Sequence, residues 1–237
     1  MRTERTSITA AAIVMQVMIA ALFFFQSCSN DPYDTGDGSL SYMRADFAEV
    51  ATNGSGEAAS ATTDEGKSLR FQSAKKVDWM TVKDSLYRAL LYYDINEDAA
   101  TATVRPIAVS QVLVPNVMKA VNGKIYPTDP VTFSSAWESR SGRYINLDIS
   151  IKTGKKDGKV EAQALGFVYN GTTIGADGTK VHSITMIHDQ GNAPQYYSVQ
   201  TYVSIPLYRL PFRAGSGDVM EIKVNTYKGV ISRQFRI

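Results

Sequence analysis

Cys28 is the residue whose type and position point most directly to chemistry. It is the only cysteine in the 237-residue chain, and it follows a basic start and an apolar run over residues 8–25. A secretory leader has such a basic start, an apolar middle and a small residue before its cleavage site. Ser27 supplies that small residue. Residues 1–27 therefore predict a lipoprotein signal peptide, and Cys28 is the predicted lipid attachment site, with palmitate as one of its acyl groups.

The leader departs from the expected pattern in two respects. Gln26 stands where a lipoprotein signal prefers a small residue. The apolar run over residues 8–25 is also long for a signal peptide, and it lies at the lower limit for spanning a bilayer. An uncleaved transmembrane anchor is therefore the alternative to lipidation of Cys28.

His182 and His188 are the only histidines of the chain. On a strand, their separation of six residues puts both on one face, about 20 Å apart at roughly 3.3 Å per residue. That distance is too long for one metal ion, whose histidine ligands lie about 2.1 Å from it. We expect the two histidines to lie at the two ends of a row of core-facing side chains that contains Ile184 and Met186. A metal or acid–base role for them is the alternative.

Other catalytic patterns are weak or missing in the sequence. No serine stands in a G-x-S-x-G elbow, and the acidic residues are too scattered to define a glycosidase pair. Asp34 and Asp37 flank glycines but do not fit the spacing of a calcium loop. We therefore predict no enzymatic activity, no catalytic residues, no metal site and no cofactor.

Aromatic side chains are the remaining candidates for ligand contact. The chain has 13 tyrosines, 2 tryptophans and 9 phenylalanines, and aromatic faces stack on sugars or anchor protein partners. Tyr126, Tyr196 and Tyr208 are the predicted exposed, ligand-binding tyrosines. Trp79 and Trp137 are expected to anchor the core.

The charge balance excludes one class of partner. The formal net charge is only +2, from 25 basic and 23 acidic residues. Nothing in it indicates a nucleic-acid-binding surface. With its one cysteine assigned to lipid, the exported chain has no disulfide, so its stability must come from a sizeable core.

The residues after Cys28 divide into a tether, a barrel and a sandwich. Residues 28–39 are rich in turn formers and predict a tether. Residues 40–118 carry β-patterning without a convincing helix. They predict about five short strands in a small barrel of the oligonucleotide/oligosaccharide-binding (OB) type.

Within the expected barrel, residues 85–95 form the clearest strand. Apolar residues occupy both of its faces, which is typical of a strand covered on both sides. Residues 51–65 are expected to be a long exposed loop. A further strand over residues 101–114 contains Pro106, which requires an edge or a bulge.

Residues 119–130 predict a linker, and residues 131–237 an immunoglobulin-like β-sandwich of about seven strands. Residues 144–152 alternate cleanly, with Asn146 expected on the solvent face. Residues 170–180 are expected to be a loop. The side chains expected to point inward from two later strands are Tyr197, Val199, Val203, Ile205, Met220, Ile222 and Val224.

Three sets of stretches resemble a known family. They are Asp64-Glu65-Gly66-Lys67-Ser68-Leu69 with Leu90-Leu91-Tyr92-Tyr93, Asp129-Pro130-Val131 and Ala136-Trp137-Glu138 with Gly142-Arg143-Tyr144-Ile145-Asn146-Leu147, and His182-Ser183-Ile184 with Ala193-Pro194-Gln195-Tyr196-Tyr197. Together with the leader, they resemble the NigD-like lipoproteins of Gram-negative anaerobes. The resemblance implies an N-terminal barrel-like domain and a C-terminal β-sandwich. It brings no established activity and no catalytic residues.

These observations predict a lipid-anchored envelope protein that binds a ligand or supports an assembly. The alternatives are a carbohydrate-binding accessory lipoprotein and a bacteriocin-associated or immunity-type factor. The predicted partners are the membrane, through the N-terminal lipid, and a protein or polysaccharide at the envelope. The predicted location is the outer membrane, with the cell surface and the periplasmic face both open.

Overall fold

The computed structural model describes residues 43–95 and 102–237 of the chain. Cys28, the leader and the tether lie outside the described residues. In the two described ranges, no helix is long and apolar enough to cross a membrane.

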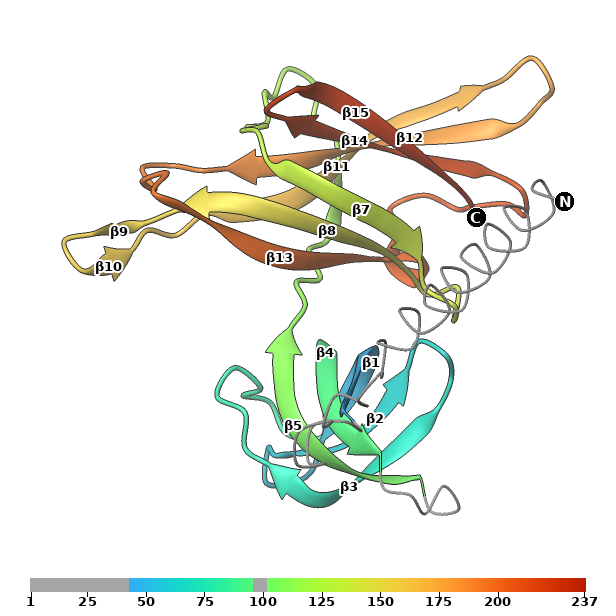
Figure 1. The fold of residues 1–237 in the computed structure, drawn as a ribbon. Helices are drawn as coiled ribbons and strands as arrows, with labels where there is room; N and C mark the ends of the chain where they lie inside the picture. The colour runs from blue at the N-terminus through green and yellow to red at the C-terminus, as the bar shows by residue number, and fades with distance from the viewer. Residues whose placement is uncertain (1–42, 96–101) are drawn as a thin grey trace, which may run out of the picture. The chain divides into compact units, whose positions relative to one another are not determined.

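The first five strands form a closed barrel (Figure 1). These strands are β1 (Met43–Thr52), β2 (Ala58–Thr63), β3 (Ser68–Lys75), β4 (Leu86–Ile95) and β5 (Thr103–Gln111). Their order around the barrel is β1-β2-β3-β5-β4, and β1 closes it by pairing with β4. The prediction of a small five-stranded barrel is confirmed.

Small side chains let this barrel close around a narrow interior. Ala48, Ala58, Ala61 and Ala89 are all buried in its core, next to larger groups such as Leu91. A small barrel has room only for a tightly filled interior, so alternation of small and large inward residues suits its taper.

The expectation of a loop over residues 51–65 is wrong, because this segment contains β2. Ala58, Ala61 and Thr63 of β2 point into the barrel and are buried. Alanine and threonine give little hydrophobic signal in a sequence, so the strand was hidden among turn-forming residues. The turn before it is held by Asn53, whose side chain accepts hydrogen bonds from the backbone N–H groups of Ser55 and Glu57.

Pro106 sits at a β-bulge, as its lack of a backbone donor requires. Tyr93 pairs with Pro106, whereas the preceding Tyr92 pairs with Ala108, so β5 contains one extra residue at this point. The prediction of an edge or bulge position is confirmed.

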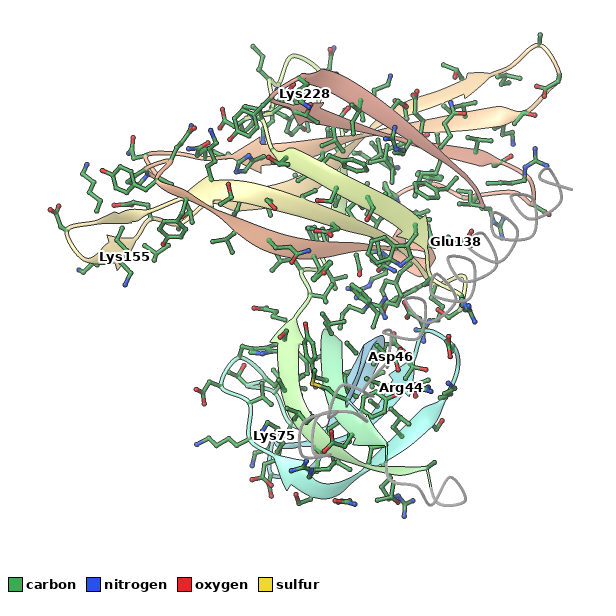
Figure 2. All side chains as sticks on the ribbon, in the orientation of Figure 1. Arg44, Asp46, Lys75, Glu138, Lys155 and Lys228 are labelled. Carbon is green, nitrogen blue, oxygen red and sulfur yellow. The ribbon has the colours of Figure 1, made fainter. Side chains whose placement is uncertain are left out.

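The remaining strands form a β-sandwich (Figure 1). They are β6 (Val117–Lys119), β7 (Thr132–Glu138), β8 (Tyr144–Thr153), β9 (Lys155–Lys156), β10 (Lys159–Val160), β11 (Ala164–Ile174), β12 (Lys180–Asp189), β13 (Tyr197–Pro206), β14 (Val219–Thr226) and β15 (Gly229–Arg236). One sheet has the order β15-β14-β12-β11-β6 and the other β13-β8-β7, while β9 and β10 make a separate hairpin. Figure 2 labels Lys155 on this hairpin and Lys228 at the β14–β15 turn, and both residues are exposed.

Side chains from both sheets meet in one core. Ile145, Leu147 and Ile149 of β8 pack with Ile184 of β12 and Ile222 of β14. The β-sandwich is therefore confirmed. Two of its pairings, β6 with β11 and β12 with β14, are parallel, whereas immunoglobulin sheets are antiparallel.

Two segment boundaries differ from the expected ones. β6 begins at Val117, within the range 40–118 assigned to the barrel, yet it pairs with β11 of the sandwich. The loop expected over residues 170–180 is shorter, because β11 continues to Ile174 and β12 begins at Lys180. A bulge between Tyr169 and Gly171 interrupts the alternation there and hides the continuing strand.

β13 is covered over only half of its length. Val203 and Ile205 are buried as expected, but Tyr197 and Val199 are exposed, so that part of the prediction is wrong. Met220, Ile222 and Val224 of β14 are buried as expected. Apolar alternation marks which face a residue occupies, but not how far the opposite sheet extends over that face.

Candidate ligand-binding site

Arg88 is a buried cation on the outer face of the barrel. Its neighbours Ala89 and Leu91 alternate with it, and Leu91 fills the barrel core. The side chain of Arg88 is only 2% exposed. Its guanidinium donates two hydrogen bonds to the carboxylate of Asp64, at 2.6 and 2.7 Å. A charge buried to this extent needs such a bidentate partner.

The same guanidinium reaches the sandwich. Its Nε donates to Ser204 Oγ at 3.2 Å and its Nη2 to Asn146 Oδ1 at 3.1 Å. Ser204 Oγ in turn donates to Asn146 Oδ1 at 2.6 Å. The guanidinium carbon lies 4.2 Å from the ring centroid of Tyr144. Arg88 therefore fastens β4 of the barrel to β8 and β13 of the sandwich.

Asn146 was expected on a solvent face and is instead fully buried. The alternation of β8 was interpreted correctly, but the outer face at its beginning is covered by Arg88 of the barrel. One sequence signal pointed to this contact, since Arg88 is the only charged residue in the apolar run over residues 86–93.

A second polar cluster joins the two parts of the chain at Glu49 of β1. Its carboxylate accepts a hydrogen bond from Arg143 Nη1 and another from the hydroxyl of Tyr144, each at 2.6 Å. The hydroxyls of Tyr144 and Tyr208 lie 3.1 Å apart. Burial, together with the hydrogen bond to Glu49, raises the pKa of Tyr144 well above its ordinary value. Tyr144 is therefore a neutral donor at physiological pH.

Two tight turns place these side chains. Ser139 Oγ accepts hydrogen bonds from the backbone N–H groups of Arg143 and Tyr144, which fixes the turn that leads into β8. After β13, Leu207–Arg209 form a short 3₁₀ turn, and the N–H of Leu207 donates to the carbonyl of Arg143. Tyr208 is thereby brought beside Arg143 and Tyr144.

These groups line a cleft of about 440 Å³, called here the Arg-Tyr cleft. Glu49, Trp79, Tyr87 and Arg88 line it from the barrel, and Arg143, Tyr144, Tyr208 and Arg209 from the sandwich. Its lining carries three guanidinium groups against one carboxylate. Ligand sites of about 300–1,000 Å³ with a few convergent polar groups are typical of small-molecule binding.

The Arg-Tyr cleft offers groups that can bind a ligand. Arginine forks bind carboxylates and phosphates, and tyrosine and tryptophan faces stack on rings. No group of three or more His, Cys, Asp or Glu residues that could hold a metal ion occurs among residues 43–95 and 102–237.

The three tyrosines predicted from the sequence lie in different surroundings. Tyr208 is 52% exposed and lines the Arg-Tyr cleft. Tyr196 is 77% exposed and packs beside Gly154, outside the cleft. Tyr126 is half-buried; its hydroxyl accepts from the N–H of Val121. Ligand contact remains a prediction for all three. The arginines of the cleft were not among the residues expected to bind a ligand, because nothing in their spacing shows that they converge.

The two tryptophans are partly buried. Trp79 packs against the barrel core and its Nε1–H donates to the carbonyl of Val109 at 3.2 Å. Trp137 meets Phe47 edge-on, with ring centroids 5.4 Å apart. The ring of Trp79 also lies next to that of Tyr87, with ring centroids 5.5 Å apart.

His182 and His188 lie buried on one face of β12 with Ile184 and Met186 between them, as expected. Each histidine has its own partners. His182 Nε2 lies 3.0 Å from Asp218 Oδ2 and its Nδ1 lies 2.8 Å from Thr172 Oγ1. His188 Nε2 lies 2.8 Å from Gln163 Oε1.

A larger hollow of about 710 Å³ lies on the sandwich beside β13. The exposed Tyr197 and Val199 line it, with Leu113, Leu165 and Val160. Its lining is mainly apolar and offers few polar groups that could orient a ligand. The Arg-Tyr cleft is therefore the stronger candidate site.

The fold and the site define a two-part all-β protein, a closed barrel followed by a β-sandwich, with a cleft lined from both. Residues 114–237 match the family model described as the NigD-like C-terminal beta sandwich domain. This match covers just over half of the chain, and the chain belongs to the NigD-like family. The comparison with curated proteins gives no match.

Several solved structures share the fold. A NigD-like immunity protein from Bacteroides caccae superposes with a TM-score of 0.62 at 17% identity, covering 81% of this chain and 96% of that one. A putative toxin-related protein from Parabacteroides distasonis gives 0.60 at 18% identity, covering 82% and 93%. A putative lipoprotein from Bacteroides fragilis gives 0.55 at 12% identity, covering 82% and 97%. At these identities the similarity concerns the fold.

Proposed function

We propose that this chain is a lipid-anchored, non-enzymatic binding protein of the outer membrane that holds its ligand in the Arg-Tyr cleft. One observation carries the proposal: guanidinium and tyrosine side chains from the barrel and from the sandwich converge on a cleft of about 440 Å³. Arg88, buried and bidentate on Asp64 of the barrel, also donates to Ser204 and Asn146 of the sandwich and so links the two walls. Because the side chains of such a preorganised cleft are already held in place, ligand binding does not carry the entropic cost of ordering them.

The lipid anchor is supported by Cys28 and by the leader before it. One neighbour of the same fold is described as a putative lipoprotein, which agrees with this assignment. Protease treatment of intact cells tests the side of the membrane: digestion of the chain indicates the cell surface, and protection indicates the periplasmic face.

The glycan-binding form of the proposal is favoured by the aromatic lining of the cleft, since aromatic faces stack on sugar rings. The test is a glycan array with the full-length chain in detergent. Tyr208→Ala is expected to abolish the binding seen with the unchanged chain. Tyr196→Ala is the matched control, because Tyr196 is an exposed tyrosine outside the cleft. Binding that survives Tyr208→Ala but not Tyr196→Ala would place the site elsewhere.

An immunity-type role is the second candidate. It is favoured by the description of one neighbour as a NigD-like immunity protein and of another as a putative toxin-related protein. It requires a protein partner. Protection of cells against a bacteriocin, lost when the chain is deleted and restored by the unchanged chain but not by Tyr208→Ala, would support it over glycan binding.

A further inference from the structure

We infer that the Arg-Tyr cleft binds a saccharide that carries a carboxylate, such as a uronic acid. This inference rests on the proposed function and names the class of ligand. Two features of the cleft carry it: the pairing of its arginines and the position of the Tyr208 ring.

Two of the three arginines already have carboxylate partners. Arg88 is bidentate on Asp64, and Arg143 pairs with Glu49. In the described part of the chain, no carboxylate lies within salt-bridge distance of Arg209. Its Nη2 donates to the Tyr208 hydroxyl, at 3.4 Å. The cleft therefore has one guanidinium free to take an anionic group of the ligand.

Two guanidinium groups lie close to the Tyr208 ring. Its centroid is 5.1 Å from the guanidinium carbon of Arg143 and 5.3 Å from that of Arg209. Half of Tyr208 is exposed. A sugar packed on the accessible part of this ring would bring a carboxylate on its edge within reach of Arg209. The opposite wall offers Trp79 and Tyr87 for further apolar contact.

The charge balance favours a carboxylate over a phosphate. One unpaired guanidinium neutralises a single negative charge in a bidentate fork. A phosphate monoester carries about −1.5 to −2 at pH 7, and the nearby Glu49 carboxylate would repel the excess. A neutral sugar would leave Arg209 without a partner.

Calorimetric titration of the full-length chain in detergent tests this inference. The probes are oligomers of galacturonate, glucuronate and sialate, each compared with its own methyl ester. The ester keeps the ring and removes the charge. The free acid of at least one pair is expected to bind about tenfold or more tightly than its ester, because a charge-assisted hydrogen bond is lost on esterification.

Substitutions separate the contribution of the Arg209 charge from that of the Tyr208 ring. Arg209→Gln is expected to lower the affinity for the acid to that for the ester and to leave the ester unchanged. Tyr208→Ala is expected to weaken both. Arg233→Gln removes an exposed arginine of β15 that does not line the cleft, and it is expected to change neither.

Equal affinity for acids and esters would overturn the inference, as would equal losses for both in Arg209→Gln. A sugar phosphate that binds more tightly than every carboxylate would also overturn it. If neutral glycans bind the array in a Tyr208-dependent way and no acid binds better than its ester, the proposed function stands and this inference fails. If no glycan binds at all, the glycan-binding proposal fails with it.

Discussion

Arg88 and Asp64 form a bidentate ion pair in which the guanidinium donates two hydrogen bonds to the carboxylate, at 2.6 and 2.7 Å. The arginine is 2% exposed and the aspartate 16%. The pair lies on the outer face of the barrel, and the same guanidinium contacts Asn146 and Ser204 of the sandwich. The barrel and the sandwich are therefore joined through a buried charge.

Arg88→Met is expected to destabilise the chain strongly. It leaves the Asp64 carboxylate without its partner in a largely buried position, and breaking a buried pair in this way costs about 3–5 kcal/mol. Urea denaturation followed by circular dichroism measures the loss. Arg70→Met is the matched control, since Arg70 is exposed on β3 and the same change there should cost less than about 0.5 kcal/mol.

Arg88→Lys sharpens this prediction. Lysine keeps the charge but cannot form the planar fork, so it should recover only part of the lost stability. Full recovery by lysine would mean that the charge alone matters and that the bidentate geometry does not.

Several features of the fold followed from residue patterns. Alternation identified the buried side chains of β14. Apolar residues on both faces of the strand over residues 85–95 indicated cover on both sides, which holds from Arg88 to Asp94, whereas Leu86 is exposed. The bulge at Pro106 followed from its missing N–H. These properties are local, because they depend on backbone chemistry and on which face a residue occupies.

Features that depend on distant contacts did not follow. The burial of Asn146 arises from Arg88, which is 58 residues away in the sequence. β2 was missed because its inward side chains are alanine and threonine. Among the residues that line the Arg-Tyr cleft, only Tyr208 was predicted from the sequence to bind a ligand. Glu49, Arg143 and Arg209 come from separate elements, and a single sequence contains no signal that they converge.

Tyr144→Phe is expected to change the stability of the chain at alkaline pH. Burial, with the hydrogen bond to Glu49, raises the pKa of Tyr144 in the folded state. In the unfolded chain a tyrosine loses its proton at about pH 10. The stabilising contribution of the protonated Tyr144 is therefore complete below about pH 10 and is lost as the pH rises toward the folded-state pKa.

The Tyr144→Phe variant should show a shallower loss of stability above about pH 10 than the unchanged chain. At neutral pH it should lose about 1 kcal/mol, the net contribution of a hydrogen bond. Thermal unfolding at a series of pH values measures both effects. Tyr197→Phe, at an exposed position of β13, is the control and should follow the unchanged chain. An identical alkaline slope in Tyr144→Phe would contradict the prediction.

Asp218→Asn is expected to remove part of the acid sensitivity of the sandwich. The hydrogen bond from His182, followed by one from the N–H of Gly215, lowers the pKa of Asp218 in the folded state. Thr172 and the stacked ring of Phe212 hold the imidazole of His182 in place. The ionised Asp218 therefore stabilises the fold above the ordinary aspartate pKa of about 3.9, and this contribution is lost as the pH falls through the folded-state pKa.

The melting temperature of Asp218→Asn should consequently be lower than that of the unchanged chain at neutral pH. The two should converge as the pH falls below about 3.9. Asp157→Asn makes the same chemical change in an exposed turn and should leave the melting temperature at neutral pH unchanged. A constant difference between Asp218→Asn and the unchanged chain at every pH would show that the carboxylate charge is not responsible.

Cys28→Ala tests the predicted anchor. Lipid attachment needs the thiol of Cys28, the only one in the chain, so incorporation of radiolabelled palmitate should fall to background. Each buried methylene contributes about 0.8 kcal/mol and one acyl chain holds only marginally, so stable anchoring requires more than one chain. Mass spectrometry of the unchanged protein should therefore find an N-terminal peptide that begins at Cys28 and carries several acyl groups.

Ser29→Ala, next to the attachment site, should keep the full label. Unchanged labelling in Cys28→Ala, or an intact leader on the unchanged protein, would instead favour a transmembrane anchor.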